Sequence, residues 1–144
     1  MLIRRNTIIP ELEAFEVLME RADAAGKEAV ANLKVTPMIV GQAKGLFSSE
    51  IDYTKPVEVV ESGVCGFAWI SIYPEFKGNT RLGKQERAVL EEFGFEQDYS
   101  NKAKYTRWVS EYGQSLQRKT AYANAAAAVF ASAGIRAFGQ SRID

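Results

Sequence analysis

The order of strand and helix patterns along the chain predicts an α+β fold in which helices cover an antiparallel sheet. From residue 64 onward, apolar residues recur with strand and helix periods in the order β-α-β-β-α-β. An amphipathic helix is predicted ahead of this core, over residues 11–33. The chain has 144 residues, 47% of them hydrophobic and 25% charged, which is the size and balance of one globular domain.

The N-terminal segment, residues 1–34, is predicted to hold one helix. Apolar residues at three- and four-residue steps share one face of it: Phe15, Leu18, Met19, Ala22, Ala29 and Leu33. Gly26 weakens a helix by about 1 kcal/mol relative to Ala, so a break at this position is an alternative. Residues 35–63 form an irregular segment, with a short strand at 38–40 and a long loop over 41–62.

Residues 64–139 are predicted to form the βαββαβ core, followed by a tail at 140–144. The predicted strands cover 64–73, 95–99, 103–110 and 135–138, and the predicted helices cover 82–93 and 115–133. This order is typical of the split βαβ, or ferredoxin-like, arrangement. Its first and third strands lie in the middle of the sheet, and both helices cover one face.

Alternation along the strands predicts a sheet face rich in aromatic residues. Phe67 and Trp69 share one side of the first core strand. We expect Tyr105 and Arg107 of the third strand to join them opposite the two helices. RNA-recognition domains of this topology stack unpaired bases on such a face. Their basic-Gly-aromatic signature on the third strand is absent; residues 104–110 read KYTRWVS instead.

Three alternatives remain for this face. The helix over 11–33 must bury its apolar stripe, which favours packing of that helix on the face, with Phe67 and Trp69 as core residues. The face is otherwise a platform for nucleic acid, or the contact of a homodimer. The last strand is expected to add Arg136 and Phe138 to the same face.

A second candidate site lies where the helix over 115–133 begins. Ser115 precedes Arg118 and Lys119, and free amides at a helix start attract anions, so this turn is a candidate anion site. An ordinary helix cap is the alternative. Ser115 and Lys119 are also spaced to meet on the helix surface, but the spacing differs from the S-x-x-K of serine acyl-enzymes.

The composition excludes much chemistry. The chain contains no histidine, which rules out catalytic triads and metal sites that depend on that residue within one chain. No phosphate-binding loop or dinucleotide fingerprint occurs, and we predict no catalytic residue, no metal and no cofactor. The single cysteine, Cys65, fits a reducing compartment. No membrane span or signal peptide is expected, so we predict a cytoplasmic location.

Charge is unevenly distributed although the formal net charge is zero. Residues 1–100 hold 11 basic and 16 acidic side chains. Residues 101–144 hold seven basic side chains against Glu111 and Asp144. The second half is therefore expected to present a basic surface to phosphates or to an acidic protein.

Three segments resemble small, uncharacterised proteins encoded by bacteriophages, a family without an assigned activity. They read GVCGFAW (63–69), QSLQRKTAYANAAA (114–127) and GIRAFGQSRID (134–144). The resemblance covers roughly residues 35–144. It implies a phage accessory protein that acts in the cytoplasm of the bacterial host or in the virion.

Three functions follow as expectations. The first is a non-enzymatic accessory protein that binds a host or viral protein through its basic C-terminal half and the 41–62 loop. The second is a single-stranded nucleic-acid-binding protein that uses Phe67, Trp69, Tyr105 and Arg107. The third is a small enzyme that depends on carboxylates or on the Ser115 and Lys119 pair.

Overall fold

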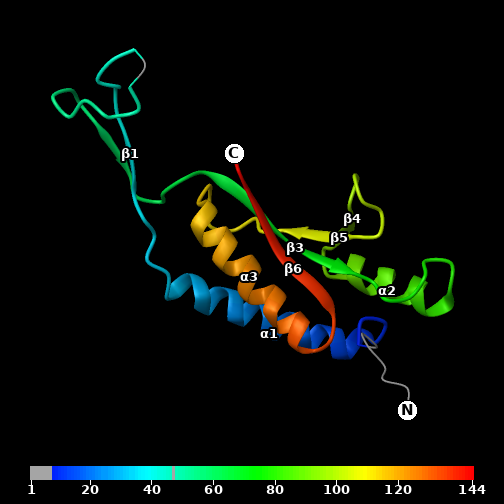
Figure 1. The fold of residues 1–144 in the computed structure, drawn as a ribbon. Helices are drawn as coiled ribbons and strands as arrows, with labels where there is room; N and C mark the ends of the chain where they lie inside the picture. Colours follow the sequence, from blue (N-terminus) through cyan, green and yellow to red (C-terminus); the bar gives the residue numbers. More distant parts are fainter. Residues whose placement is uncertain (1–7, 47) are drawn as a thin grey trace.

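The computed structural model describes residues 8–46 and 48–144 and shows a mixed α/β architecture, with three helices and two antiparallel sheets (Figure 1). Residues 1–7, which the sequence analysis includes in the N-terminal segment, and residue 47 of the predicted loop lie outside the described residues. The elements are α1 (Leu12–Ala31), β1 (Met38–Val40), β2 (Glu58–Val60), β3 (Gly66–Tyr73), α2 (Arg81–Glu92), β4 (Glu96–Gln97), β5 (Tyr105–Trp108), α3 (Leu116–Ser132) and β6 (Arg136–Ile143).

The larger sheet has four antiparallel strands in the order β4-β5-β3-β6. Trp69 lies opposite Trp108 in the pairing of β3 with β5, and opposite Gln140 in the pairing of β3 with β6. The predicted α+β class is confirmed. The strand count differs from the prediction, because β1 pairs with a strand that the sequence did not reveal, β2, in a separate two-stranded sheet.

Strand β6 is longer than predicted. The sequence suggested a strand over 135–138 and a tail over 140–144, yet Gln140, Ser141 and Arg142 all pair with β3. The predicted tail is wrong because β6 is an edge strand whose second half is exposed. Its polar residues therefore lack the apolar alternation that marks a half-buried strand.

Helix α1 packs along α3 rather than on the open side of the sheet (Figure 1). The ring of Phe15 stacks on that of Phe130, with centroids 5.4 Å apart. The helix runs through Gly26 without a break, and a Cβ at this position would lie 2.5 Å from a ring carbon of Tyr122. Gly26 thus allows the close approach of the two helices, and the Tyr122 hydroxyl donates a hydrogen bond to the Asp23 carboxylate beside it.

The loop that follows β3 is fixed to α2 by a buried carboxylate. Glu86 is fully buried and accepts hydrogen bonds from the backbone N–H groups of Glu75 (3.0 Å) and Phe76 (2.7 Å). Burial raises the pKa of Glu86, against the opposing effect of these two donors. The Thr80 side chain caps α2 by accepting from the Gly83 N–H, as its position in the sequence indicates.

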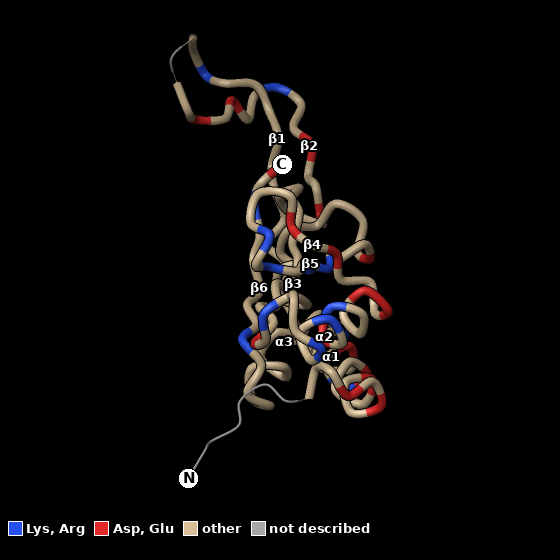
Figure 2. Tube along the Cα trace, turned by 90° about the vertical axis from the view of Figure 1, so that its right-hand side faces the viewer, with Lys and Arg blue, Asp and Glu red and all other residues tan. Residues whose placement is uncertain are grey.

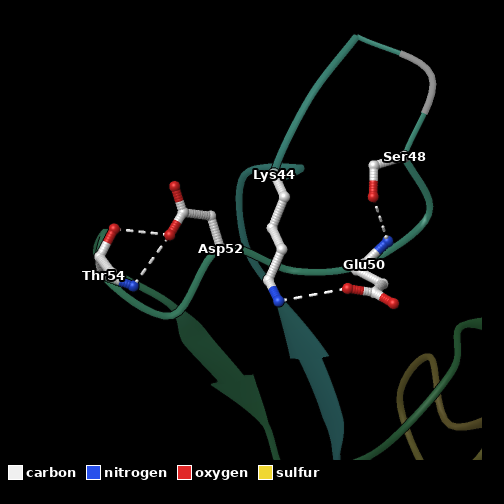
Figure 3. Close-up of polar contacts among 5 residues, drawn as sticks. All are labelled: Lys44, Ser48, Glu50, Asp52 and Thr54. Atoms are coloured by element: carbon white, nitrogen blue, oxygen red, sulfur yellow. Dashed lines mark hydrogen bonds and ion pairs between the residues drawn. The ribbon is translucent and has the colours of Figure 1, made fainter.

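The two-stranded sheet projects from the rest of the molecule as an arm, which we call the ribbon (residues 38–46 and 48–60; Figure 1). Local polar contacts hold its tip: Lys44 pairs with Glu50 at 3.2 Å, and the Asp52 carboxylate accepts from the Thr54 N–H at 3.0 Å (Figure 3). The apolar side chain of Leu46 is 93% exposed. The ribbon is therefore held by its own pairing and turns.

Candidate functional site

Five aromatic side chains lie on the side of the four-stranded sheet that no helix covers, and we call this surface the aromatic face. It consists of Phe67, Trp69 and Tyr73 from β3, Trp108 from β5 and Phe138 from β6. Successive side chains point to opposite sides of a strand, and directly paired residues share a side, so the register places these five together. Trp108 and Phe138 are each 49% exposed.

The rings of the aromatic face contact one another in two groups. The Trp69 and Trp108 centroids are 4.7 Å apart, and Phe67 meets Trp108 edge-on at 5.9 Å. At the other end of β3, Tyr73 meets Phe138 edge-on at 6.1 Å. These tilted and edge contacts are the arrangements that aromatic quadrupoles favour, and they hold the rings in place as a preformed surface.

Cations lie beside the rings at both ends of the face. The Arg136 guanidinium is 4.4 Å from the Tyr73 centroid. At the far end, the Phe67 centroid lies 5.5 Å from the Arg142 guanidinium and 5.7 Å from Lys119 Nζ. These distances are within the range of cation–π attraction. The same surface therefore offers flat rings and positive charge.

Gln140 occupies the centre of the face, between the two groups of rings. Its Oε1 accepts hydrogen bonds from Trp69 Nε1 (2.9 Å), from the Ser71 hydroxyl (2.6 Å) and from Lys104 Nζ (3.3 Å). Within the described part of the chain, no acceptor bonds its Nε2 group. The Gln140 amide is exposed, so these two N–H donors are available to a ligand on the face.

The structure confirms the predicted place of Phe67 and Trp69 but not that of Tyr105 and Arg107. Tyr105 pairs with Ile72 and Arg107 pairs with Ile70, so both belong to the helix-covered side. Tyr105 is 4% exposed, and Arg107 Nε donates to the Phe93 carbonyl at 3.2 Å. The expected phase of β5 is wrong by one residue, so Trp108 and not Arg107 lies on the aromatic face.

A signal for the correct phase was present in the sequence. Tyr105 and Val109 are the large apolar residues at even spacing, and both are buried, at 4% and 3% exposure. The charged Arg107 between them obscured this pattern, because its guanidinium reaches the end of α2 while its stem lies under the helices.

The predicted anion site at the start of α3 is only partly assembled. Ser115 is the N-cap: its hydroxyl accepts from the Arg118 N–H at 3.3 Å and donates to the Ser62 carbonyl at 2.9 Å. Lys119, 6% exposed, points to Phe67 on the aromatic face. Adjacent helix residues diverge by about 100°, so Arg118 and Lys119 do not form one site.

The opposite side of the molecule is acidic. A shallow depression beside α1 is lined by Glu16, Glu20, Asp23 and Glu111, with Lys27 and Arg107 as its cations. Figure 2 shows basic residues along β6 and acidic residues gathered at the α1 side. Among residues 8–46 and 48–144, no three cysteine or carboxylate side chains come together to hold a metal ion.

Comparison with protein-family models, with curated proteins and with solved structures found no match to this chain. No helix in the described part of the chain is long and apolar enough to cross a membrane.

Proposed function

We propose that the protein binds single-stranded nucleic acid on the aromatic face. One observation carries this proposal: five aromatic side chains, two of them half exposed, lie together on an uncovered antiparallel sheet with arginines beside the rings at its two ends. Unpaired bases stack on such rings at about 1–3 kcal/mol per base, and guanidinium groups serve the backbone.

The distribution of charge supports the binding of nucleic acid on this face. Four of the basic residues in 101–144 lie on or beside the aromatic face: Lys104, Lys119, Arg136 and Arg142. The acidic residues beside α1 lie on the other side of the sheet and would repel phosphates there. More than half of the basic residues of the C-terminal part thus lie at the aromatic face.

The arrangement of the sheet supports a finer reading of the fold. We propose that β3, α2, β4, β5, α3 and β6 correspond to the ferredoxin-like unit predicted from the sequence, with α1 and the ribbon as additions. The central positions of β3 and β5 support this assignment. The bacteriophage origin implied by the three sequence segments stays a prediction.

Tryptophan fluorescence tests the proposal directly, because both tryptophans of the chain, Trp69 and Trp108, lie in the aromatic face. Ten-nucleotide single strands of uniform sequence are titrated into the protein at low salt. We expect saturable quenching that weakens as salt rises, since the phosphate contribution is screened. A duplex of the same length is expected to bind more weakly, because its bases are already stacked.

A matched control uses Tyr53, an aromatic residue that is 66% exposed on the ribbon. Tyr53→Ala is expected to leave the titration unchanged. Absence of quenching at low salt would contradict the proposal. Emission that changes with protein concentration alone, with dimers in sedimentation, would instead assign the face to a second copy of the chain. A protein partner is the remaining alternative, and it is favoured if a partner protein protects Trp108 where oligonucleotides do not.

A further inference from the structure

Two cations from different elements meet at the ring of Phe67. Lys119 Nζ, from α3, lies 5.7 Å from the ring centroid, and the Arg142 guanidinium, from β6, lies 5.5 Å from it. Arg142 is also the register partner of Phe67 across β3 and β6. Folding therefore brings two like charges to one edge of the aromatic face.

The stem of Lys119 is almost entirely covered, and no carboxylate of the described residues pairs with its ammonium. Only 6% of its surface is exposed. The ion pairs of the described residues join Lys27 to Asp23, Lys44 to Glu50 and Lys55 to Asp52, all in other parts of the fold. Among these residues, Lys119 Nζ also has no hydrogen-bond acceptor. Asp144, two residues beyond Arg142, pairs with neither cation in this structure.

Two like charges at one ring repel each other, and no carboxylate of the described residues pairs with either of them. The position adds to the positive potential: Lys119 lies four residues after the N-cap Ser115, where the dipole of the 17-residue helix α3 is positive. The Phe67 ring offsets only part of this repulsion. An anion held between the two cations would offset the remainder.

We infer that Lys119 and Arg142 form a phosphate subsite beside Phe67. This inference rests on the proposed function: the phosphate is that of the nucleotide whose base stacks on Phe67. Lysine acts there as a point charge, whereas the guanidinium of Arg142 can bind two phosphate oxygens at once. Ser115 does not contribute its hydroxyl, because that group is engaged with Ser62 and Arg118.

The distance between the two ends of the aromatic face limits the length of the bound strand. Phe67 and Tyr73 are six residues apart on β3, which corresponds to about 20 Å of extended chain. Among the described residues, Lys119 and Arg142 lie at the Phe67 ring and Arg136 lies at the Tyr73 ring. A strand of two or three stacked bases therefore runs along β3, with one phosphate held at Phe67.

The first test is the salt dependence of oligonucleotide binding. Lys119→Met and Arg142→Gln are each expected to reduce the slope of log K against log salt by about 0.7, the value for one phosphate contact on a single strand. The affinity at 0.1 M salt then falls about fivefold. Lys119→Arg keeps the charge and is expected to keep the slope. The control is Lys84→Gln, which removes an exposed lysine of α2 and should change neither quantity.

The second test uses inorganic phosphate and needs no oligonucleotide. At constant ionic strength, phosphate is expected to raise the unfolding midpoint of the native chain and of Lys84→Gln, but not that of Lys119→Met. Without phosphate, Lys119→Met is expected to be the more stable protein, because the repulsion between the Lys119 and Arg142 charges is gone. Arg142→Gln alters an exposed side chain and serves if Lys119→Met does not fold.

The two tests separate the inference from the function on which it rests. Oligonucleotide binding with an unchanged salt slope in both variants would overturn the subsite and leave the proposed function intact. Phosphate stabilisation that depends on Lys119, in a protein that binds no oligonucleotide, would support the subsite and overturn the proposed function. Equal stabilisation of all variants by phosphate overturns the subsite.

Discussion

The two sides of the four-stranded sheet place aromatic residues in different environments. On the helix side, the Phe15 ring packs 5.4 Å from both Phe93 and Phe130, and Phe15 and Phe130 are fully buried. On the open side, the Trp108 and Phe138 rings are half exposed, and charged groups lie against their neighbours. Aromatic content alone therefore does not distinguish a core from an open sheet face; the exposure of the rings and the accompanying cations do.

The largest expected effect is on the helix side. Phe130→Ala removes a fully buried ring from the contact of α3 with α1 and should reduce the free energy of unfolding by about 3–5 kcal/mol. Denaturant titration followed by circular dichroism measures this loss. Trp108→Ala, on the open side, should cost less because the ring is half exposed. Equal costs at the two positions would break the comparison.

The next largest effect is expected on oligonucleotide affinity, from a substitution on the open side of the sheet. Trp108→Ala is expected to weaken oligonucleotide binding by about 5- to 150-fold, the equivalent of 1–3 kcal/mol for one stacked base. The remaining tryptophan, Trp69, still reports binding by its fluorescence. Trp108→Phe keeps a flat ring and should recover part of the affinity. If Trp108→Ala binds as tightly as the native chain, the binding site does not include Trp108 and lies elsewhere.

The sequence predicted the α+β class and the places of β3, α2 and α3, because these elements display their periodicity over many residues. It also placed Phe67 and Trp69 on the correct side. It could not supply the phase of β5, which has four residues and an arginine among its inward positions. Strand register is a tertiary property, and a shift by one residue exchanges the two faces.

The sequence also could not predict that α1 leaves the aromatic face uncovered. The apolar stripe of α1 fits any apolar surface, and its sequence pattern favoured packing on the aromatic face. Local contacts decide where α1 packs. Gly26 lets α1 approach the ring of Tyr122 on α3, and Phe15 fits between Phe93 and Phe130. The convergence of Lys119 and Arg142 on Phe67 likewise depends on the unforeseen length of β6.

The pH dependence of stability sharpens the comparison, because the Tyr122 hydroxyl that causes it lies on the helix side of the sheet. Burial and the Asp23 carboxylate raise the pKa of Tyr122 well above its ordinary value. Above about pH 10 the unfolded chain loses this proton while the folded chain keeps it, so stability falls with rising pH by up to about 1.4 kcal/mol per unit. Tyr122→Phe should abolish this part of the alkaline loss in unfolding titrations.

The Asp23 carboxylate of the same contact gives stability the opposite dependence on pH. Hydrogen bonds from Lys27 and then from Tyr122 lower the pKa of Asp23. The stabilisation that they provide is present above the ordinary aspartate pKa near 4 and is lost as the pH falls below it. Denaturant titrations above and below this pH measure the loss, and Asp23→Asn should abolish it.

The smallest expected effect concerns the ribbon. Replacement of residues 41–57 by a short turn keeps the Thr36–Gln117 hydrogen bonds and the Ser62 contact with Ser115, through which the ribbon's base joins the rest of the fold. The removed part is held by its own turns, so the unfolding midpoint should change by no more than about 2 °C and oligonucleotide affinity should stay within twofold. A large loss of affinity would transfer the binding surface from the sheet to the ribbon, which the sequence first suggested for a protein partner. Unchanged affinity, together with the loss caused by Trp108→Ala, would confine binding to the open side of the sheet.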